Sequence, residues 1–164
     1  MNMKKLILVA AFFLTAIVSV NAQSIANNAL GVRFGDNDGF GGEISYQHAL
    51  GDNHRLELDL GFRSHKNFDA FKLTGLHQWV MNIDGGFNWY VGLGAGVGSW
   101  SWDDDGFGDD DDGVFVNLDG NLGIEYNFDF PLLISLDVRP EFGVVGDYGD
   151  DADFDIALGL RYQF

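Results

Sequence analysis

The chain has 164 residues, a length that suits one ordinary domain rather than two. Its 9 Lys and Arg residues stand against 25 Asp and Glu residues, and the formal net charge of −16 argues against a nucleic-acid partner, because little could neutralise the phosphates. The absence of Cys excludes disulfides, thiolate metal sites and a Cys nucleophile, and a hydrophobic fraction of 46% is too high for a disordered acidic chain.

The start of the chain has the pattern of a cleavable secretory signal peptide. Positive charge near the N-terminus is followed by an apolar run over 6–20 and by Val20-Asn21-Ala22, which satisfies the small-residue cleavage rule. The apolar run is short for a membrane-spanning helix, which needs about 20 residues. We therefore predict a signal peptide at 1–22 and one secreted domain at 23–164.

Beyond this segment the chain alternates large apolar residues with small or polar ones, which indicates β-strands with one apolar face. The segment from Phe154 to Phe164 shows the alternation clearly, since every even position is large and apolar. Breaker residues divide the chain into eight such runs, which we predict as strands at 29–35, 40–50, 55–65, 69–81, 87–100, 114–127, 132–145 and 154–164.

The connections between the predicted strands fall into two alternating sets. The uniformly short set lies at 51–54, 82–86 and 128–131, and the other set lies at 36–39, 66–68, 101–113 and 146–153. Outer-membrane barrels have short periplasmic turns and longer extracellular loops, and they close the sheet so that no strand edge is left unpaired. The predicted fold class is therefore all-β, an eight-stranded antiparallel up-and-down transmembrane β-barrel preceded by a cleavable signal peptide.

The polar phase of the strands indicates which face lies inside the barrel. Basic and acidic residues share this phase in near-balanced numbers, as in an internal network of ion pairs rather than a solubilising shell. Gly92, Gly94, Gly96 and Gly98 share it too, and small residues inside a narrow barrel make room for long charged side chains. We expect an internal charge network of Arg33, Glu43, Glu57, Asp59, Arg63, Lys72, Asp119, Glu125, Asp137, Arg139 and Arg161, with Arg55, Glu141 and Asp155 on the same phase.

The apolar phase is sorted along the strands, with aliphatic residues in the middle and aromatic residues at both ends. Two aromatic girdles around an aliphatic band are typical of the two interfaces of a membrane barrel. The girdle at the short-turn end contains Trp79, Phe87, Trp89, Tyr126, Phe128, Tyr162 and Phe164, and the girdle at the long-loop end contains Phe34, Phe40, Phe62, Phe71, Phe142 and Phe154.

The whole predicted domain resembles the small eight-stranded outer-membrane proteins of the OmpX/OmpA type. The segments Gly123-Ile-Glu-Tyr-Asn-Phe-Asp-Phe-Pro-Leu132 and Ser135-Leu-Asp-Val-Arg-Pro-Glu-Phe142 resemble small outer-membrane β-barrel proteins of Bacteroidota. The resemblance implies a location in the bacterial outer membrane, with outer-membrane lipid and lipopolysaccharide as partners, and it carries no catalytic motif. It also implies that Tyr162 and Phe164 form the assembly signal that the barrel-assembly machinery reads.

Two acidic segments fall in the long connections. The first contains Asp103, Asp104, Asp105, Asp109, Asp110, Asp111 and Asp112, and the second contains Asp147, Asp150, Asp151 and Asp153. Clustered carboxylates suit hard cations, so Ca²⁺ or Mg²⁺ is the one cofactor we consider, including as a bridge to lipopolysaccharide phosphates. The spacing does not match an EF-hand loop, and a solvated, self-repelling loop is the alternative reading.

No recognised catalytic motif is present. Ser64, His65, Ser99 and Ser101 fall near the long-loop rim, where lipid-modifying barrels use His and Ser, but a triad is recognised by geometry and not by spacing. We therefore predict that the protein is not an enzyme. Separately, Pro140 lies inside a predicted strand, where its missing N–H favours a bulge that would reverse the phase of the residues after it.

These observations predict a monomeric, non-enzymatic outer-membrane barrel with a charge-plugged lumen and an acidic extracellular rim, acting in envelope structure or surface interaction. Eight strands leave an interior only wide enough for side chains to fill, which weighs against an open pore. Three alternatives stay open on the sequence, namely a narrow porin-like channel, a divalent-cation-binding surface protein and a soluble lipocalin-like carrier.

Overall fold

The structure, a computed structural model, describes residues 25–35, 41–65, 68–102, 111–146 and 152–164. The predicted signal peptide at 1–22 lies outside these residues. The strands are β1 (Asn28–Gly35), β2 (Glu43–Ala49), β3 (His54–His65), β4 (Phe68–Asp84), β5 (Phe87–Trp102), β6 (Asp111–Asn127), β7 (Leu132–Val145) and β8 (Ala152–Gln163). All eight predicted strands are confirmed. No helix within the described ranges is long and apolar enough to cross a membrane.

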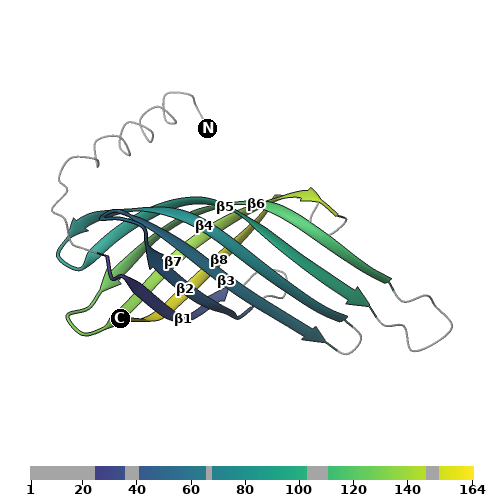
Figure 1. The fold of residues 1–164 in the computed structure, drawn as a ribbon, viewed down its shortest axis with the longest axis horizontal. Coiled ribbons are helices and arrows are strands. Elements are labelled where there is room, and N and C mark those ends of the chain that lie inside the picture. Colours follow the sequence, from purple (N-terminus) through teal and green to yellow (C-terminus); the bar gives the residue numbers. More distant parts are fainter. Residues whose placement is uncertain (1–24, 36–40, 66–67, 103–110, 147–151) are drawn as a thin grey trace, which may run out of the picture.

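The sheet is a closed barrel in which every strand pairs antiparallel with its neighbours in the chain (Figure 1). Closure comes from β1, which pairs with β8 from Ala29–Gln163 to Gly35–Ala157. The backbone N–H and C=O groups along the strands therefore find partners within the sheet, as a bilayer requires. The predicted fold, an eight-stranded antiparallel up-and-down barrel, is confirmed.

The strands differ in length, and this difference shapes the long-loop end. β1 and β2 have 8 and 7 residues, whereas β4, β5 and β6 have 17, 16 and 17. Figure 1 shows β3 to β6 reaching beyond β1 and β2 at that end. The pairing of β5 with β6 continues to Trp102 and Asp111, so the strands occupy part of the segment predicted as a loop at 101–113.

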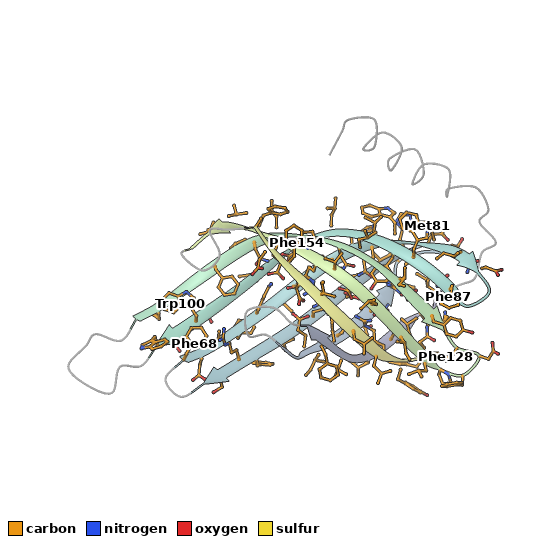
Figure 2. All side chains as sticks on the ribbon, turned by 180° about the vertical axis from the view of Figure 1, so that it is seen from behind. Phe68, Met81, Phe87, Trp100, Phe128 and Phe154 are labelled. Carbon is orange, nitrogen blue, oxygen red and sulfur yellow. The ribbon has the colours of Figure 1, made fainter. Side chains whose placement is uncertain are left out.

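The barrel is polar inside and apolar outside. The guanidinium-bearing Arg33 and Arg139 are 0% exposed, whereas Leu93 and Leu158 in the middle of their strands are 63% and 52% exposed. Figure 2 shows side chains projecting from the outer face, with Met81, Phe87 and Phe128 near one end of the barrel. The alternation in the sequence thus sends apolar residues outward, the reverse of a water-soluble protein.

The predicted bulge at Pro140 was wrong. Asp119 pairs with Glu141 in the register that β6 and β7 keep on the other side of Pro140, and the pairing of β7 with β8 runs through it without a break. The missing N–H therefore falls on the β6 side, opposite Gly120, where a Cβ would come within 3.0 Å of the proline ring. The register shifts only later, between Val116 and the residue after it in β6. Glu141 accordingly stays on the inward phase.

Candidate functional site in the barrel interior and at the rim

Arg33 of β1 is the centre of a group of ion pairs inside the barrel. Its guanidinium donates to Glu43 at 2.9 Å, to Asp137 at 2.6 Å and to Asp155 at 2.5 Å. These carboxylates come from β2, β7 and β8, so one side chain ties together four strands. The five donors of a guanidinium suit such shared recognition, whereas a lysine ammonium carries only three.

Two further arginines fill the interior next to this group. Arg139 of β7 donates to Asp59 and to Glu43, the latter at 3.2 Å. Arg161 of β8 pairs with Glu57 of β3 at 3.0 Å and also donates to the hydroxyls of Ser45 and Ser135. Other residues taking part are Gln47, which donates to Glu57, and Tyr90 and Asn121, which donate to Asp137. The pairs of Arg139 with Asp59 and of Arg161 with Glu57 join strands that are not neighbours in the barrel, whereas Gln47 and Asn121 contact carboxylates on the next strand.

The short-turn half of the interior contains another buried pair. Arg55 and Glu125 lie 2.7 Å apart, and the Arg55 guanidinium also lies 4.7 Å from the centre of the Tyr90 ring. Arg55 donates to Gln78, which in turn donates to Asn121. The sequence reasoning did not single out the neutral members Tyr90, Gln78 and Asn121, although their even or odd position on each strand places them on the polar phase.

Lys72 of β4 passes over one of the glycines on β5. Its side chain passes over Gly96, where an added Cβ would lie 3.0 Å from the Lys72 Cε, and its ammonium reaches Glu141 of β7 at 2.5 Å. Asp119, which lies between these strands, accepts from Asn117. Gly96 therefore makes room for a long cationic side chain that crosses two strands, whereas Gly92 lies against Gln78 and Gly98 against the Phe115 ring.

Arg63 stands apart from the buried arginines. It is half-buried near the end of β3, and its guanidinium lies 5.2 Å from the centre of the Phe68 ring. The structure therefore brings together ten of the eleven predicted network residues inside the barrel and places Arg63 at the rim. The alternation along β3 predicts that Arg63 faces inward, but it does not predict how far along the barrel axis Arg63 lies. That position decides whether a side chain lies within the barrel or at its mouth.

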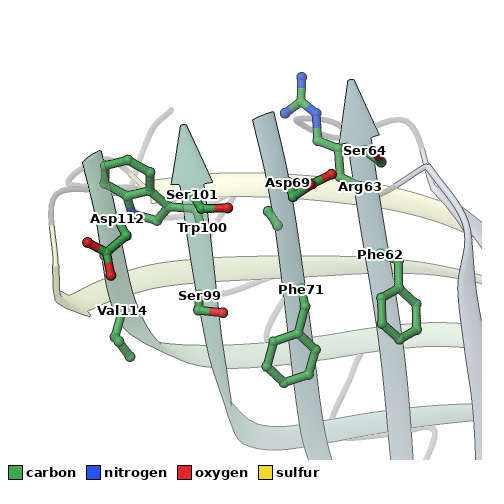
Figure 3. A pocket seen from close by; sticks show the side chains of 12 residues that line it. Phe62, Arg63, Ser64, Asp69, Phe71, Ser99, Trp100, Ser101, Asp112 and Val114 are labelled. Carbon is green, nitrogen blue, oxygen red and sulfur yellow. The ribbon is translucent and has the colours of Figure 1, made fainter. Parts of the chain in front are cut away.

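The rim carries a pocket of about 430 Å³ across the ends of β3, β4, β5 and β6 (Figure 3). Phe62, Phe71 and Val114 form its apolar side, and polar residues lie nearer the strand ends. Those polar residues are Ser64, Asp69, Ser101 and Asp112, while Ser99 lies level with its strand partners Phe71 and Val114. Ser64, Ser99 and Ser101 thus do gather in one place, but no histidine lines the pocket, and the side chain of His65 lies outside the described residues.

The predicted metal site falls mostly on residues that are not described. Asp103, Asp104, Asp105, Asp109 and Asp110 lie outside the described ranges, whereas Asp111 and Asp112 belong to β6. Among the described residues, no group of three or more His, Cys, Asp or Glu side chains is placed to hold a metal ion. Cation binding by the acidic segments remains a prediction.

The two aromatic ends of the barrel are built from ring contacts between neighbouring residues. At the short-turn end Tyr126 contacts Phe87 at 4.5 Å and Phe128 at 4.7 Å between ring centres, and Tyr162 stacks on Phe164 at 6.2 Å. At the long-loop end Phe62 lies 6.3 Å from Phe71. Tyr162 and Phe164, the predicted assembly signal, are exposed on the outer face, while Phe40 lies outside the described residues.

Comparison with solved structures finds the same barrel in several bacterial proteins. The N-terminal β-barrel domain of Pseudomonas aeruginosa OprF matches with a TM-score of 0.64 and 13% identity over 85% of this chain and 98% of that one. Neisserial surface protein A matches with a TM-score of 0.62 and 13% identity over 84% of this chain and 94% of that one. Ail, the attachment invasion locus protein of Yersinia pestis, matches with a TM-score of 0.56 and 16% identity over 85% of this chain and all 100% of that one.

No protein-family model matches the sequence, and no curated protein matches it. The structural matches are therefore likenesses of fold, at identities too low to carry residue roles. The predicted assignment to Bacteroidota stays a prediction. In fold, the chain is similar to the small eight-stranded outer-membrane β-barrels of the OmpA/OmpX type.

Proposed function

We propose that the protein is a non-enzymatic envelope protein that spans a bacterial outer membrane. The observation that carries the proposal is the reversed distribution of side chains, with arginines and carboxylates inside and exposed aliphatic residues outside. Leu58, Leu118, Leu136 and Leu158 face outward from four strands, and a water-soluble barrel would gain nothing from exposing them. In hydrocarbon these residues are in their preferred solvent, and the closed sheet leaves no strand edge there.

Two of the alternatives lose support from the same geometry. A lipocalin-like carrier needs an apolar interior, whereas the described interior is lined mainly by buried polar and charged residues. A narrow channel needs a continuous polar path, whereas Arg33, Arg139 and Arg161 are fully buried in contacts that cross the barrel. We infer that the ion-pair network plugs the lumen and holds the barrel in one shape.

The proposed site of interaction with the surroundings is the long-loop rim. The rim pocket combines apolar side chains with hydroxyls and the carboxylates of Asp69 and Asp112, and the segments 103–112 and 147–153 add further Asp residues to that end. Ail has been solved in complex with the heparin analogue sucrose octasulfate, a polyanion. The Asp residues at this rim are negatively charged and would repel such a ligand. We therefore expect partners that are cationic, or divalent cations that bridge to anionic lipopolysaccharide.

The location is tested by fractionation and by the response of the band on a detergent gel to heating. A membrane barrel that is resistant to detergent migrates faster before boiling than after it, and it sediments with the outer membrane. A mobility that ignores heating, together with recovery in the soluble fraction, would overturn the proposal. The plug is tested separately by recording in planar lipid bilayers, where the wild-type barrel should give no steady conductance.

A further inference from the structure

Two histidines from neighbouring strands meet on the outer face at the short-turn end. His54 is the first residue of β3 and pairs with Trp79 of β4, while His77 pairs with the residue two positions after His54. The residues next to each histidine, Arg55 and Gln78, are buried inside the barrel, so the two histidines point outward. They are therefore diagonal neighbours on one face of the sheet, a separation that side chains can bridge.

The imidazole rings are placed for joint coordination of one ion. Nδ1 of His54 lies 3.1 Å from Nε2 of His77, with the ring centres 5.3 Å apart. Each imidazole nitrogen binds Zn²⁺ at about 2.0–2.1 Å, so two nitrogens on one ion lie about 2.9–3.4 Å apart for angles between a right angle and the tetrahedral value. The observed spacing falls within this range, so no movement of the strands is needed.

Metal binding here needs a change of tautomer and a rotation of the imidazole rings about their side-chain bonds, so that both lone pairs point at one ion. Without a metal, one of the two nitrogens donates its proton to the other, as their separation indicates. When an ion binds, that proton moves to the other nitrogen of its own ring, and both facing nitrogens present a lone pair. The rings stay neutral, which is the form in which histidine coordinates metals.

The surroundings favour a transition metal over other ligands. His54 is exposed, so water can complete the coordination shell, and the Trp79 ring packs 4.6 Å from His77. Among the described Lys and Arg residues, Arg63 lies at the opposite rim and the others point into the barrel, so none of them faces an ion bound here. Imidazole ligands suit Cu²⁺, Zn²⁺ and Ni²⁺, whereas Ca²⁺ and Mg²⁺ prefer oxygen.

We propose that His54 and His77 form a two-histidine site for a divalent transition-metal ion, with Cu²⁺ bound more tightly than Zn²⁺. The order follows the general affinity series of divalent metals. The protein supplies two ligands, one fewer than a cluster of three carboxylates or histidines would supply. Water fills the remaining coordination positions of the ion. The site depends only on the outer face of the β3–β4 hairpin and not on where the barrel resides.

The test is titration of the full chain, folded in detergent micelles, with Cu²⁺ and then Zn²⁺, followed by calorimetry. We expect one Cu²⁺ per barrel at this site, and an electron paramagnetic resonance spectrum with hyperfine splitting from two imidazole nitrogens. His54→Ala and His77→Ala should each weaken binding by about 10–100-fold or more, since even the loss of an outer-shell partner costs that much. His48→Ala is the matched control, because His48 lies at the same end but contacts Asn28 at 3.0 Å instead.

Several results would overturn the proposal. One is an unchanged Cu²⁺ affinity in both histidine variants, and another is a spectrum of the wild-type protein with fewer than two nitrogen ligands. Binding that ignores these variants and is displaced by Ca²⁺ would place the ion on the acidic segments instead. The shift of the band on heating shows whether each variant has folded, and the wild-type spectrum decides the matter even if a variant does not fold.

Discussion

Replacing Arg139 with Met should strongly destabilise the barrel, because its fully buried guanidinium pairs with the fully buried Asp59. The methionine keeps the length of the side chain but removes its charge. Glu43 would keep Arg33 at 2.9 Å and Glu57 would keep Arg161 at 3.0 Å, but the ion pairs found for Asp59 among the described residues involve Arg139 alone. The variant therefore leaves one buried carboxylate uncompensated, a change that costs about 3–5 kcal/mol of unfolding free energy.

Urea unfolding in lipid vesicles, followed by tryptophan fluorescence, measures this cost. The double variant Arg139→Met with Asp59→Asn should recover most of the loss, because neither charge is then left alone. Lys72→Met is the matched control near the rim, since its partner Glu141 retains a 20% exposed side chain and can be solvated. A cost below about 1 kcal/mol for Arg139→Met, or a double variant as unstable as the sum of the two single changes, would refute the reasoning.

Three further predictions follow from the same structure. Leu158→Arg, in the middle of the outward face of β8, should lower the unfolding free energy in a bilayer by about 2–4 kcal/mol, whereas Ser101→Arg at the rim should lower it by about 0–1 kcal/mol. Equal effects of the two variants on unfolding in vesicles would argue against a membrane-spanning band. Gly94→Ala should lower refolding yield, because its Cβ would lie 1.8 Å from the Gly75 carbonyl oxygen, whereas Gly51→Ala, with open space around it, should refold as the wild type does. Arg33→Ala combined with Arg139→Ala should raise conductance in planar bilayers above the wild-type level, and silence in both would show that other side chains close the lumen.

Much of the fold could be read from the sequence, because two constraints act on every residue of a strand. The alternation of side chains along a strand assigns each residue to the inner or the outer face. The sorting of aromatic and aliphatic residues assigns it to a position along the barrel axis. Asp137 and Arg161, for example, were predicted on the inner face from phase alone, and the structure buries both. The pattern therefore predicts the strands, their number and their direction.

The pairing of the charges could not be predicted in this way. Phase places Arg33 inside the barrel, but its three carboxylate partners depend on the stagger between β1, β2, β7 and β8. Arg63 has the same phase as Asp59 and yet lies at the rim, because β3 continues past the closed part of the barrel. The bulge predicted at Pro140 was also wrong, because Gly120 on the neighbouring strand provides the space that a bulge would otherwise supply.

The composition of the interior follows from what a bilayer removes. In lipid, burying an apolar side chain inside the barrel gains little, because the hydrocarbon outside is equally apolar, so specificity must come from polar contacts. A lone buried charge is costly, whereas Arg33 with three carboxylates and Arg139 with Asp59 and Glu43 satisfy one another across strands that are distant in sequence. Because Glu43 is shared between Arg33 and Arg139, the two groups form one connected unit. A shift in the register of any strand would separate several of these pairs at once, so the network selects one closed barrel among the registers that the hydrophobic alternation alone would allow.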